Sequence, residues 1–366
     1  MSTFNDIAGF EAFSITADSD STITIFANGY QQVRVYVRMI AIDKDRKYVN
    51  LSGGELKKLQ EAITLINFNN SNLLTKVDKY ADGKSDWSYT TTQGEYKQPE
   101  TKGAISALSS NMMSLTYYVM CPPDENERTI KVAVKLKLSN GKVVDTTGSS
   151  GFDSKVSLKA NAPTVYNINY RDNRQSENDN LRAIYTRVRS EEINGDPAWV
   201  ENYTVSIRAG EFLYKRSTPS SAVTSYDSVR VRREHISSWA YCMYFRHYAY
   251  THQIANICYW FSENDTTRNL TVGYFGEVGI GGGVYMENVP ANTEQSLFNF
   301  SVARFEDTDN NAYSEDIESS TAVDTYIECN FRDQYGNAGT FFAYPHPETG
   351  DNYYRGYAYE FLSQRK

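Results

Sequence analysis

Cysteine, histidine and proline are scarce in this chain of 366 residues, with 4, 4 and 9 copies. The four cysteines are too few and too far apart in the sequence for a disulfide scaffold. Four histidines leave little material for general acid–base catalysis, and the sequence contains neither a GxSxG elbow nor a GxxxxGK[ST] phosphate loop. An enzyme of unknown class is therefore the third of three functional hypotheses.

Long apolar runs and an excess of positive charge are missing as well. No run reaches 18 apolar residues, and the first residues lack the basic start of a signal peptide, so we expect neither a transmembrane helix nor a signal peptide. We expect a soluble product of the cytoplasm that reaches the outside, if it does, by lysis, by non-classical export or within a particle. The net charge of -8 argues against a nucleic-acid partner, which needs a basic face.

Aromatic residues are abundant, with 29 Tyr and 17 Phe, and tyrosine favours β structure. Val33, Val35 and Val37 alternate with polar residues, which predicts a half-buried strand over 33–41. Apolar residues at 132–138 alternate with lysines in the same way. This second pattern indicates a solvated strand, with an edge position as one interpretation.

One helix is expected, over residues 52–66. Ser52 and Glu55 have the spacing of a capping box. The following apolar residues share one helical face: Leu56, Leu59, Ala62, Ile63 and Ile66.

Turn signals divide the rest of the chain into short strands. Asn28-Gly29, Asn140-Gly141 and the segment 333–337 separate runs of strand-forming residues, a spacing typical of sandwiches. The glycines at 148 and 151 and the segment KANAPTV indicate a domain boundary near residue 165. We therefore predict a mainly β protein with two tandem β-sandwich-like domains, 1–165 and 166–366, and one helix in the first domain.

Two segments resemble bacterial Ig-like modules of the invasin type. They are ANGYQQVRVYVRMIAIDKDRKYV and CNFRDQYGNAGTFF, each an alternating strand next to an Asp/Gly/Asn turn. The resemblance implies a non-catalytic sandwich and provides no site residues. The helix departs from that pattern and puts a simple Ig topology in doubt.

The aromatic segment 237–263 contains Cys242, His247, His252 and Cys258, a possible set of zinc ligands. Residues five apart on a strand point to opposite faces, so a metal site would need a bend between Cys242 and His247. A hairpin centred near Tyr250 is the alternative, and it would place Cys242 opposite Cys258. We favour an aromatic core hairpin.

An acidic segment is the candidate metal site. Asp307, Asp309, Asn311 and Glu318 occupy positions 1, 3, 5 and 12 of an EF-hand-like loop. Ala312 replaces the glycine of position 6, and the flanking segments read as strands. The sequence leaves two interpretations, a Ca²⁺ site in a β-loop and a solvated acidic loop. Ca²⁺ is the one cofactor considered.

Tyrosines near the C-terminus form the candidate binding surface: Tyr353, Tyr354, Tyr357 and Tyr359. Rigid aromatic side chains contact partners at low entropic cost. Alternatively, this segment docks on its own domain, which we favour.

The leading hypothesis is a non-catalytic microbial or viral structural, assembly or target-binding protein that uses aromatic-rich β surfaces. Its partner would be a second copy or a protein or glycan receptor. The alternative is a toxin component that binds a cell and forms a β-pore, with the glycine-rich segment 273–290 as the membrane hairpin. Membrane contact is expected only in that case.

Overall fold

The computed structural model describes residues 2–19, 21–79, 86–99, 109–123, 128–171, 174–193, 196–207, 215–216, 229–231, 236–237, 240–243, 253–260, 267–273, 283–290, 298–307, 327–347 and 357–364. They form two compact units. Unit 1 comprises Met1–Thr164 and Gln334–Asn337, and unit 2 comprises Val165–Asp333 and Ala338–Lys366.

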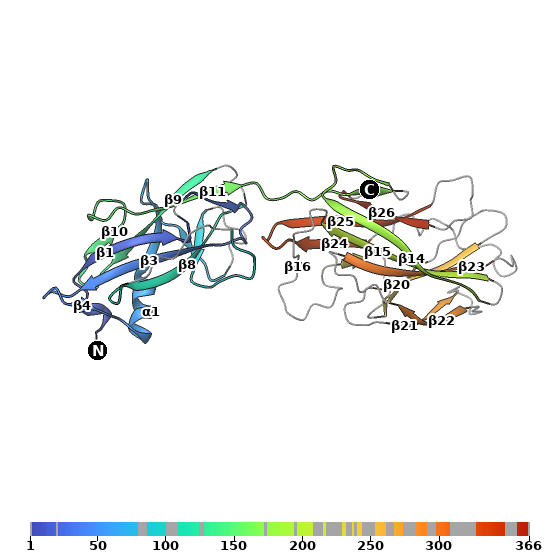
Figure 1. Ribbon diagram of the computed structural model, residues 1–366, viewed down its shortest axis with the longest axis horizontal. Coiled ribbons are helices and arrows are strands. Elements are labelled where there is room, and N and C mark those ends of the chain that lie inside the picture. Colours follow the sequence, from blue (N-terminus) through green and yellow to red (C-terminus); the bar gives the residue numbers. More distant parts are fainter. Residues whose placement is uncertain are drawn as a thin grey trace. The chain divides into compact units, whose positions relative to one another are not determined.

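Unit 1 contains a six-stranded and a five-stranded sheet (Figure 1). The first has the order β1-β3-β8-β7-β6, with β4 on β3. Its strands are β1 (Gly9–Ala17), β3 (Val33–Ile42), β4 (Tyr48–Val49), β6 (Thr75–Lys76), β7 (Ser88–Thr90) and β8 (Met113–Met120). The second has the order β10-β9-β11-β2, with β5 on β9. Its strands are β2 (Ile23–Phe26), β5 (Ile63–Asn67), β9 (Thr129–Lys137), β10 (Val143–Asp145) and β11 (Val156–Asn161).

The core of unit 1 lies between the inner faces of these sheets. Val35 and Val37 of β3 are fully buried in one cluster with Val132 and Val134 of β9. Along β3 buried and half-buried residues alternate without a break, which confirms the predicted strand. Gly29, at the predicted Asn28-Gly29 turn, has a φ of 76°, which suits glycine because it lacks a Cβ.

The helix α1 (Gly53–Ala62) confirms the predicted helix but ends four residues earlier than expected. Residues 63–67 form β5 instead, and Ile63 pairs with Leu136 of β9. Ile63, Leu65 and Ile66 are all buried in the strand. Pairing with β9 buries these three apolar side chains, so tertiary packing overrides the helical periodicity.

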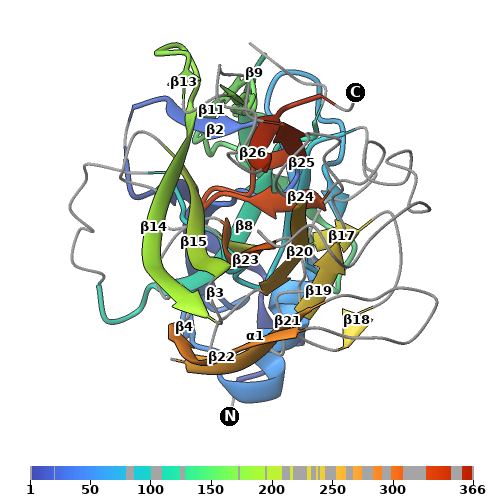
Figure 2. The same ribbon diagram turned by 90° about the vertical axis from the view of Figure 1, so that its right-hand side faces the viewer.

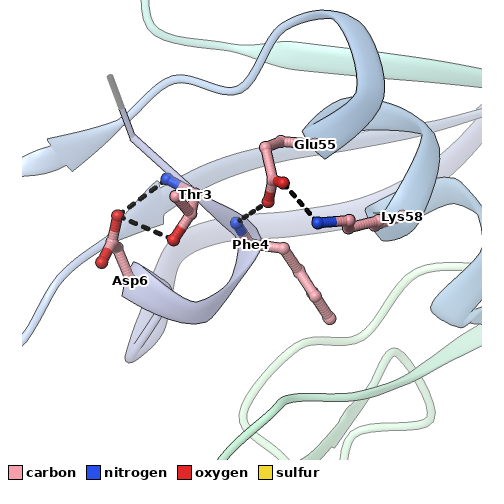
Figure 3. Close-up of polar contacts among 5 residues, drawn as sticks. All are labelled: Thr3, Phe4, Asp6, Glu55 and Lys58. Carbon is pink, nitrogen blue, oxygen red and sulfur yellow. Dashed lines mark hydrogen bonds and ion pairs between the residues drawn. The ribbon is translucent and has the colours of Figure 1, made fainter.

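The predicted capping box at Ser52 is wrong. Ser52 is the N-cap residue but makes no side-chain hydrogen bond to the helix. Glu55 turns instead toward the N-terminal segment, where its Oε2 accepts a hydrogen bond of 2.8 Å from Phe4 N, while its Oε1 pairs with Lys58 Nζ (Figure 3). These bonds lower the pKa of Glu55, the Lys58 contact first and the Phe4 amide second. The carboxylate therefore fastens the short 3-10 helix η1 (Phe4–Asp6) to α1.

Strand β9 is interior, so its lysines do not mark an edge. It pairs with β5 along residues 132–136, and on its other side with β11 and β10. Lys131 and Lys135 are half-buried and Lys137 is exposed. The alternation of apolar residues and lysines correctly predicted which side chains of β9 are buried. It carries no information on how many strands pair with β9.

Side chains cover the backbone at two sheet edges of unit 1. Ile15 N, on β1, donates a hydrogen bond of 2.8 Å to Ser154 Oγ. Phe26 N, on β2, donates one of the same length to Gln31 Oε1. Because an unpaired edge amide is a template for strand addition by another chain, these contacts disfavour association at those positions.

Unit 2 contains a seven-stranded sheet and a six-stranded sheet among its described residues, with a separate two-stranded pair. The first has the order β13-β12-β26-β25-β24-β16, with β17 on β24. It comprises β12 (Asn169–Arg171), β13 (Arg174–Gln175), β16 (Lys215–Arg216), β17 (Val229–Val231), β24 (Ile327–Arg332), β25 (Ala338–Pro347) and β26 (Tyr357–Leu362).

The six-stranded sheet has the order β14-β15-β23-β20-β19-β18. It comprises β14 (Leu181–Ile193), β15 (Asp196–Ile207), β18 (Ile236–Ser237), β19 (Ala240–Met243), β20 (Gln253–Trp260) and β23 (Phe298–Asp307). Strands β14 and β15 form the long hairpin in green in Figure 2. The two-stranded pair is β21 (Thr267–Gly273) and β22 (Gly283–Pro290).

Aromatic rings form the described core of unit 2. Phe331, Phe341 and Phe361, from β24, β25 and β26, are at most 1 % exposed. The ring of Tyr203 on β15 lies 6.1 Å from that of Phe361, so the two larger sheets pack face to face. Tyr166 packs on Phe331 at 4.9 Å and donates a hydrogen bond of 2.7 Å to Asp333 Oδ2. Burial, followed by this bond, raises the pKa of Tyr166.

The predicted fold class is therefore confirmed: the protein is mainly β and sandwich-like, and one α-helix occurs among the described residues. No helix in the described part of the chain is long and apolar enough to cross a membrane.

Candidate functional site

The outer face of β3 presents a row of alternating charge and aromatic surface. Because side chains alternate along a strand, burying Val33, Val35 and Val37 turns Arg34, Tyr36 and Arg38 outward. Asp18, which follows β1, joins them. We call these four residues, Asp18, Arg34, Tyr36 and Arg38, the Arg–Tyr ladder.

Tyr36 holds the two guanidinium groups of the ladder in place. The Cζ atom of Arg34 lies 5.5 Å from the centre of the Tyr36 ring, and that of Arg38 lies 5.4 Å from it. Each contact is a cation–π interaction, worth about 0.5–1 kcal/mol at an exposed site. Burial, followed by hydrogen bonding to Asp18, raises the pKa of the Tyr36 hydroxyl, which stays neutral at pH 7.

Arg34 and Arg38 differ in their charge partners. Arg34 donates from Nε and Nη2 to Asp18 Oδ2, at 3.1 and 2.7 Å. This pairing raises the pKa of Arg34. Arg38 has no ion pair within the described residues, and its Nε is buried there without a hydrogen-bond acceptor. The ladder contains two guanidinium groups and one carboxylate, so its net charge is +1. Because Asp18 pairs with Arg34, this charge lies on Arg38.

Hydroxyl side chains flank the ladder on both neighbouring strands. Arg38 pairs in register with Ser14 of β1 and Ser114 of β8, and Tyr36 pairs with Thr16 and Thr116. Residues directly opposite each other on paired strands share a face of the sheet. All four hydroxyl residues are half-buried, as are the three ladder residues of β3. At one end, Tyr118 donates a hydrogen bond to Gln93 Oε1.

The predicted Ca²⁺ site cannot be placed as a whole. Asp307 is the last residue of β23, whereas Asp309, Asn311 and Glu318 lie outside the described residues. In the part of the chain that the structure describes, no three His, Cys, Asp or Glu side chains gather as metal ligands. The Ca²⁺ loop stays a prediction.

The structure describes two of the four tyrosines of the predicted binding surface near the C-terminus. Tyr353 and Tyr354 lie outside the described residues, whereas Tyr357 and Tyr359 belong to β26 and pair with Pro347 and Pro345. Strand β26 is flanked by β25 and β12, so this segment docks in a sheet of its own unit. A binding role for the four tyrosines stays a prediction.

In the aromatic segment 237–263, the backbone register places Cys242 directly opposite Cys258, as the hairpin alternative predicts. His247 and His252 lie outside the described residues, so zinc binding there stays untested. The glycine-rich segment contributes β22, which pairs with β21. The first segment that resembles invasin-type modules contains β3 and β4, and the second covers β24 and the start of β25.

The sequence identified Arg34, Tyr36 and Arg38 as the polar face of a strand but not as a candidate site. The spacing Arg-x-Tyr-x-Arg on a half-buried strand was the available signal, since it predicts cation–π contacts on one face. Asp18 could not be predicted from sequence, because it reaches Arg34 only through the pairing of β1 with β3.

Comparisons with known proteins give no family for this chain. No protein-family model matches it, and neither does any curated protein. Among solved structures, the chain is similar to the C-terminal domain of the AgI/II polypeptide BspA of Streptococcus agalactiae. The identity is 8 %, the TM-score is 0.22, and the alignment covers 90 % of this chain and 97 % of that one. A similarity at this level does not bear on function.

Proposed function

We propose that this chain is a non-catalytic binding protein that engages a target through the outer face of the six-stranded sheet of unit 1. The Arg–Tyr ladder is the observation that supports this proposal. It combines positive charge held by cation–π contacts, an aromatic ring and flanking hydroxyl groups on a half-buried surface. Arginine and tyrosine are enriched where proteins bind partners. The invasin-type resemblance of the segment containing β3 agrees with a non-catalytic role.

The sheet edges support contact through a face rather than by strand addition. Ser154 and Gln31 already bond the amides of Ile15 and Phe26 at two edges of unit 1. Self-association, if it occurs, would then use the faces of the sheets as well. A partner molecule and a second copy of the chain would thus both bind through a sheet face.

The toxin alternative has less support. Strands β21 and β22 have seven and eight residues, and spanning a bilayer takes roughly 9–11 residues per tilted strand. We therefore place target binding first, structural assembly second and pore formation third.

A face variant and a charge-matched control test the proposal. The face variant is Arg34→Ala/Tyr36→Ala/Arg38→Ala. The control, Lys44→Ala/Lys57→Ala, removes the same number of positive charges from exposed positions outside the ladder. Both variants and the unsubstituted protein are applied to glycan and protein arrays, and their self-association is measured by sedimentation velocity.

We expect at least one interaction that the face variant loses and the control keeps. If every interaction survives in the face variant, the ladder is not the contact surface. Circular dichroism and thermal melting establish that each variant is folded before its binding is compared.

A further inference from the structure

We propose that the ligand of the Arg–Tyr ladder is an acidic polysaccharide, whose carboxylate or sulfate groups bind Arg38. This inference rests on the proposed function and names the chemical class of its target.

Charge indicates an anionic ligand. The chain has a net charge of -8, yet the ladder carries one positive charge after Asp18 has neutralised Arg34. The local positive charge attracts anionic groups, whereas the net negative charge of the whole chain disfavours the approach of a second copy. Guanidinium binds carboxylate and sulfate oxygens through paired N–H donors, which is why arginine suits such groups better than lysine.

The two arginine side chains of the ladder are held in position before any ligand binds. An exposed arginine ordinarily loses much rotamer freedom when it binds, and this loss weakens the complex. Here Tyr36 fixes the guanidinium groups of Arg34 and Arg38 on either side of it along the strand, at 5.5 and 5.4 Å from its ring centre. Asp18 further restricts Arg34 through two hydrogen bonds. The charged groups are therefore placed before the ligand arrives.

The surroundings favour a glycan over an acidic peptide. Next to the ladder lie the half-buried hydroxyl residues Ser14, Ser114 and Thr116, whereas the Thr16 hydroxyl is buried. Protein partners usually insert an aromatic or aliphatic anchor into a fully desolvated pocket. A polysaccharide carries hydroxyl groups along its length, which can exchange hydrogen bonds with the side chains of Ser14, Ser114 and Thr116.

Binding to four polymers tests the inference. Heparin presents sulfate groups, polygalacturonate presents carboxylates, dextran is a neutral polysaccharide and poly-glutamate is an acidic peptide. Isothermal titration calorimetry with the full chain at low salt measures each affinity. We expect binding of at least one acidic polysaccharide, weaker or absent binding of dextran and poly-glutamate, and weakening by added salt.

Substitution of Arg38 locates the site. Arg38→Ala should weaken binding of the acidic polysaccharide about tenfold, the effect of removing one charge-assisted hydrogen-bonding group. Arg38→Lys should lose less, because it keeps the charge but not the paired donors. Lys57→Ala, on the exposed side of α1, is the charge-matched control and should leave the affinity unchanged. If Arg38→Ala proves unstable in thermal melting, Arg38→Gln replaces it as the uncharged variant.

Any of four results would overturn the inference: equal binding of poly-glutamate, equal binding of dextran, the same loss with Lys57→Ala as with Arg38→Ala, or no binding of any polysaccharide. The proposed function fails separately, and only if no interaction at all depends on Arg34, Tyr36 and Arg38. A protein partner lost in the face variant would therefore keep the proposed function and exclude the glycan.

Discussion

Replacing Gly339 by alanine should destabilise unit 2 strongly, although glycine is usually a weak residue in a strand. Gly339 on β25 pairs with Phe331 on β24, and the Phe331 ring lies across it. A Cβ at position 339 would stand 2.2 Å from Cζ of Phe331 and 2.5 and 2.8 Å from its two Cε atoms. Contacts this short cannot persist, so the ring must move.

The surrounding rings make that movement unfavourable. Phe331 is 1 % exposed and packs against Tyr166 at 4.9 Å and Phe341 at 6.4 Å. Overpacking a core of this kind costs about 1–3 kcal/mol, and a lost aromatic pair adds about 0.5–1.5 kcal/mol. We expect Gly339→Ala to lower the free energy of unfolding by roughly 2–4 kcal/mol.

Urea unfolding followed by tryptophan fluorescence measures this loss. Three of the four tryptophans, Trp199, Trp239 and Trp260, belong to unit 2, so the signal reports mainly on that unit. Gly54→Ala is the control, because no atom lies within 4 Å of a Cβ built there and the position is helical. It should be neutral or slightly stabilising.

A double variant isolates the cause. Leucine lacks the Cζ and Cε atoms that the new Cβ would meet, so Gly339→Ala should cost little in a Phe331→Leu background. The coupling energy between the two substitutions should then be close to the full loss from Gly339→Ala alone. An unchanged stability of Gly339→Ala, or an equal loss in both backgrounds, would refute the steric argument.

Three further predictions follow from single contacts or strand pairs, and one from the acidic segment of the sequence. The pKa of Glu55 is lowered from its ordinary value of 4.5, so its ionised form stabilises the fold above pH 4.5 and this contribution disappears as the pH falls below that value. The melting temperature should rise with pH between pH 3 and 6, and Glu55→Gln should make this rise smaller. The same pH profile in Glu55→Gln as in the unsubstituted protein would contradict the role of Glu55. Ser154→Ala should remove the acceptor of Ile15 N, cost about 1–3 kcal/mol and speed hydrogen exchange at that amide, while Ser154→Thr restores protection. If the acidic loop holds Ca²⁺, EDTA should lower the melting temperature, and Asp309→Ala should abolish this response; no response to EDTA removes the site. Cα atoms of directly opposed antiparallel residues lie about 4.5–5.5 Å apart, within the roughly 4.4–6.8 Å that a disulfide spans. Diamide, which accepts the two electrons and two protons of the thiols, should therefore join Cys242 to Cys258, and mass spectrometry without that cross-link would contradict the register.

Hydrophobic periodicity was sufficient to predict the strands of unit 1 in which apolar and polar residues alternate clearly. In β3 and β9 the inner residues were predictable because a period of two places every second side chain on one face. The helix was predictable at its start but not at its end, since Leu56, Leu59 and Ala62 fit a helix while Ile63 is drawn into the sheet by β9. The spacing of apolar residues within one segment carries no information on a distant strand, such as β9, that pairs with part of it.

Tertiary structure alone decided which polar residues meet. Glu55 has the spacing for a local cap, yet it binds Phe4, 51 residues away in the chain, because η1 lies against α1. Asp18 reaches Arg34 because β1 pairs with β3, whereas Arg38 has no ion pair among the residues that the structure describes. Periodicity thus specifies which face of a strand a side chain occupies. The pairing of strands distant in sequence specifies its neighbours, and the candidate site arises from those neighbours.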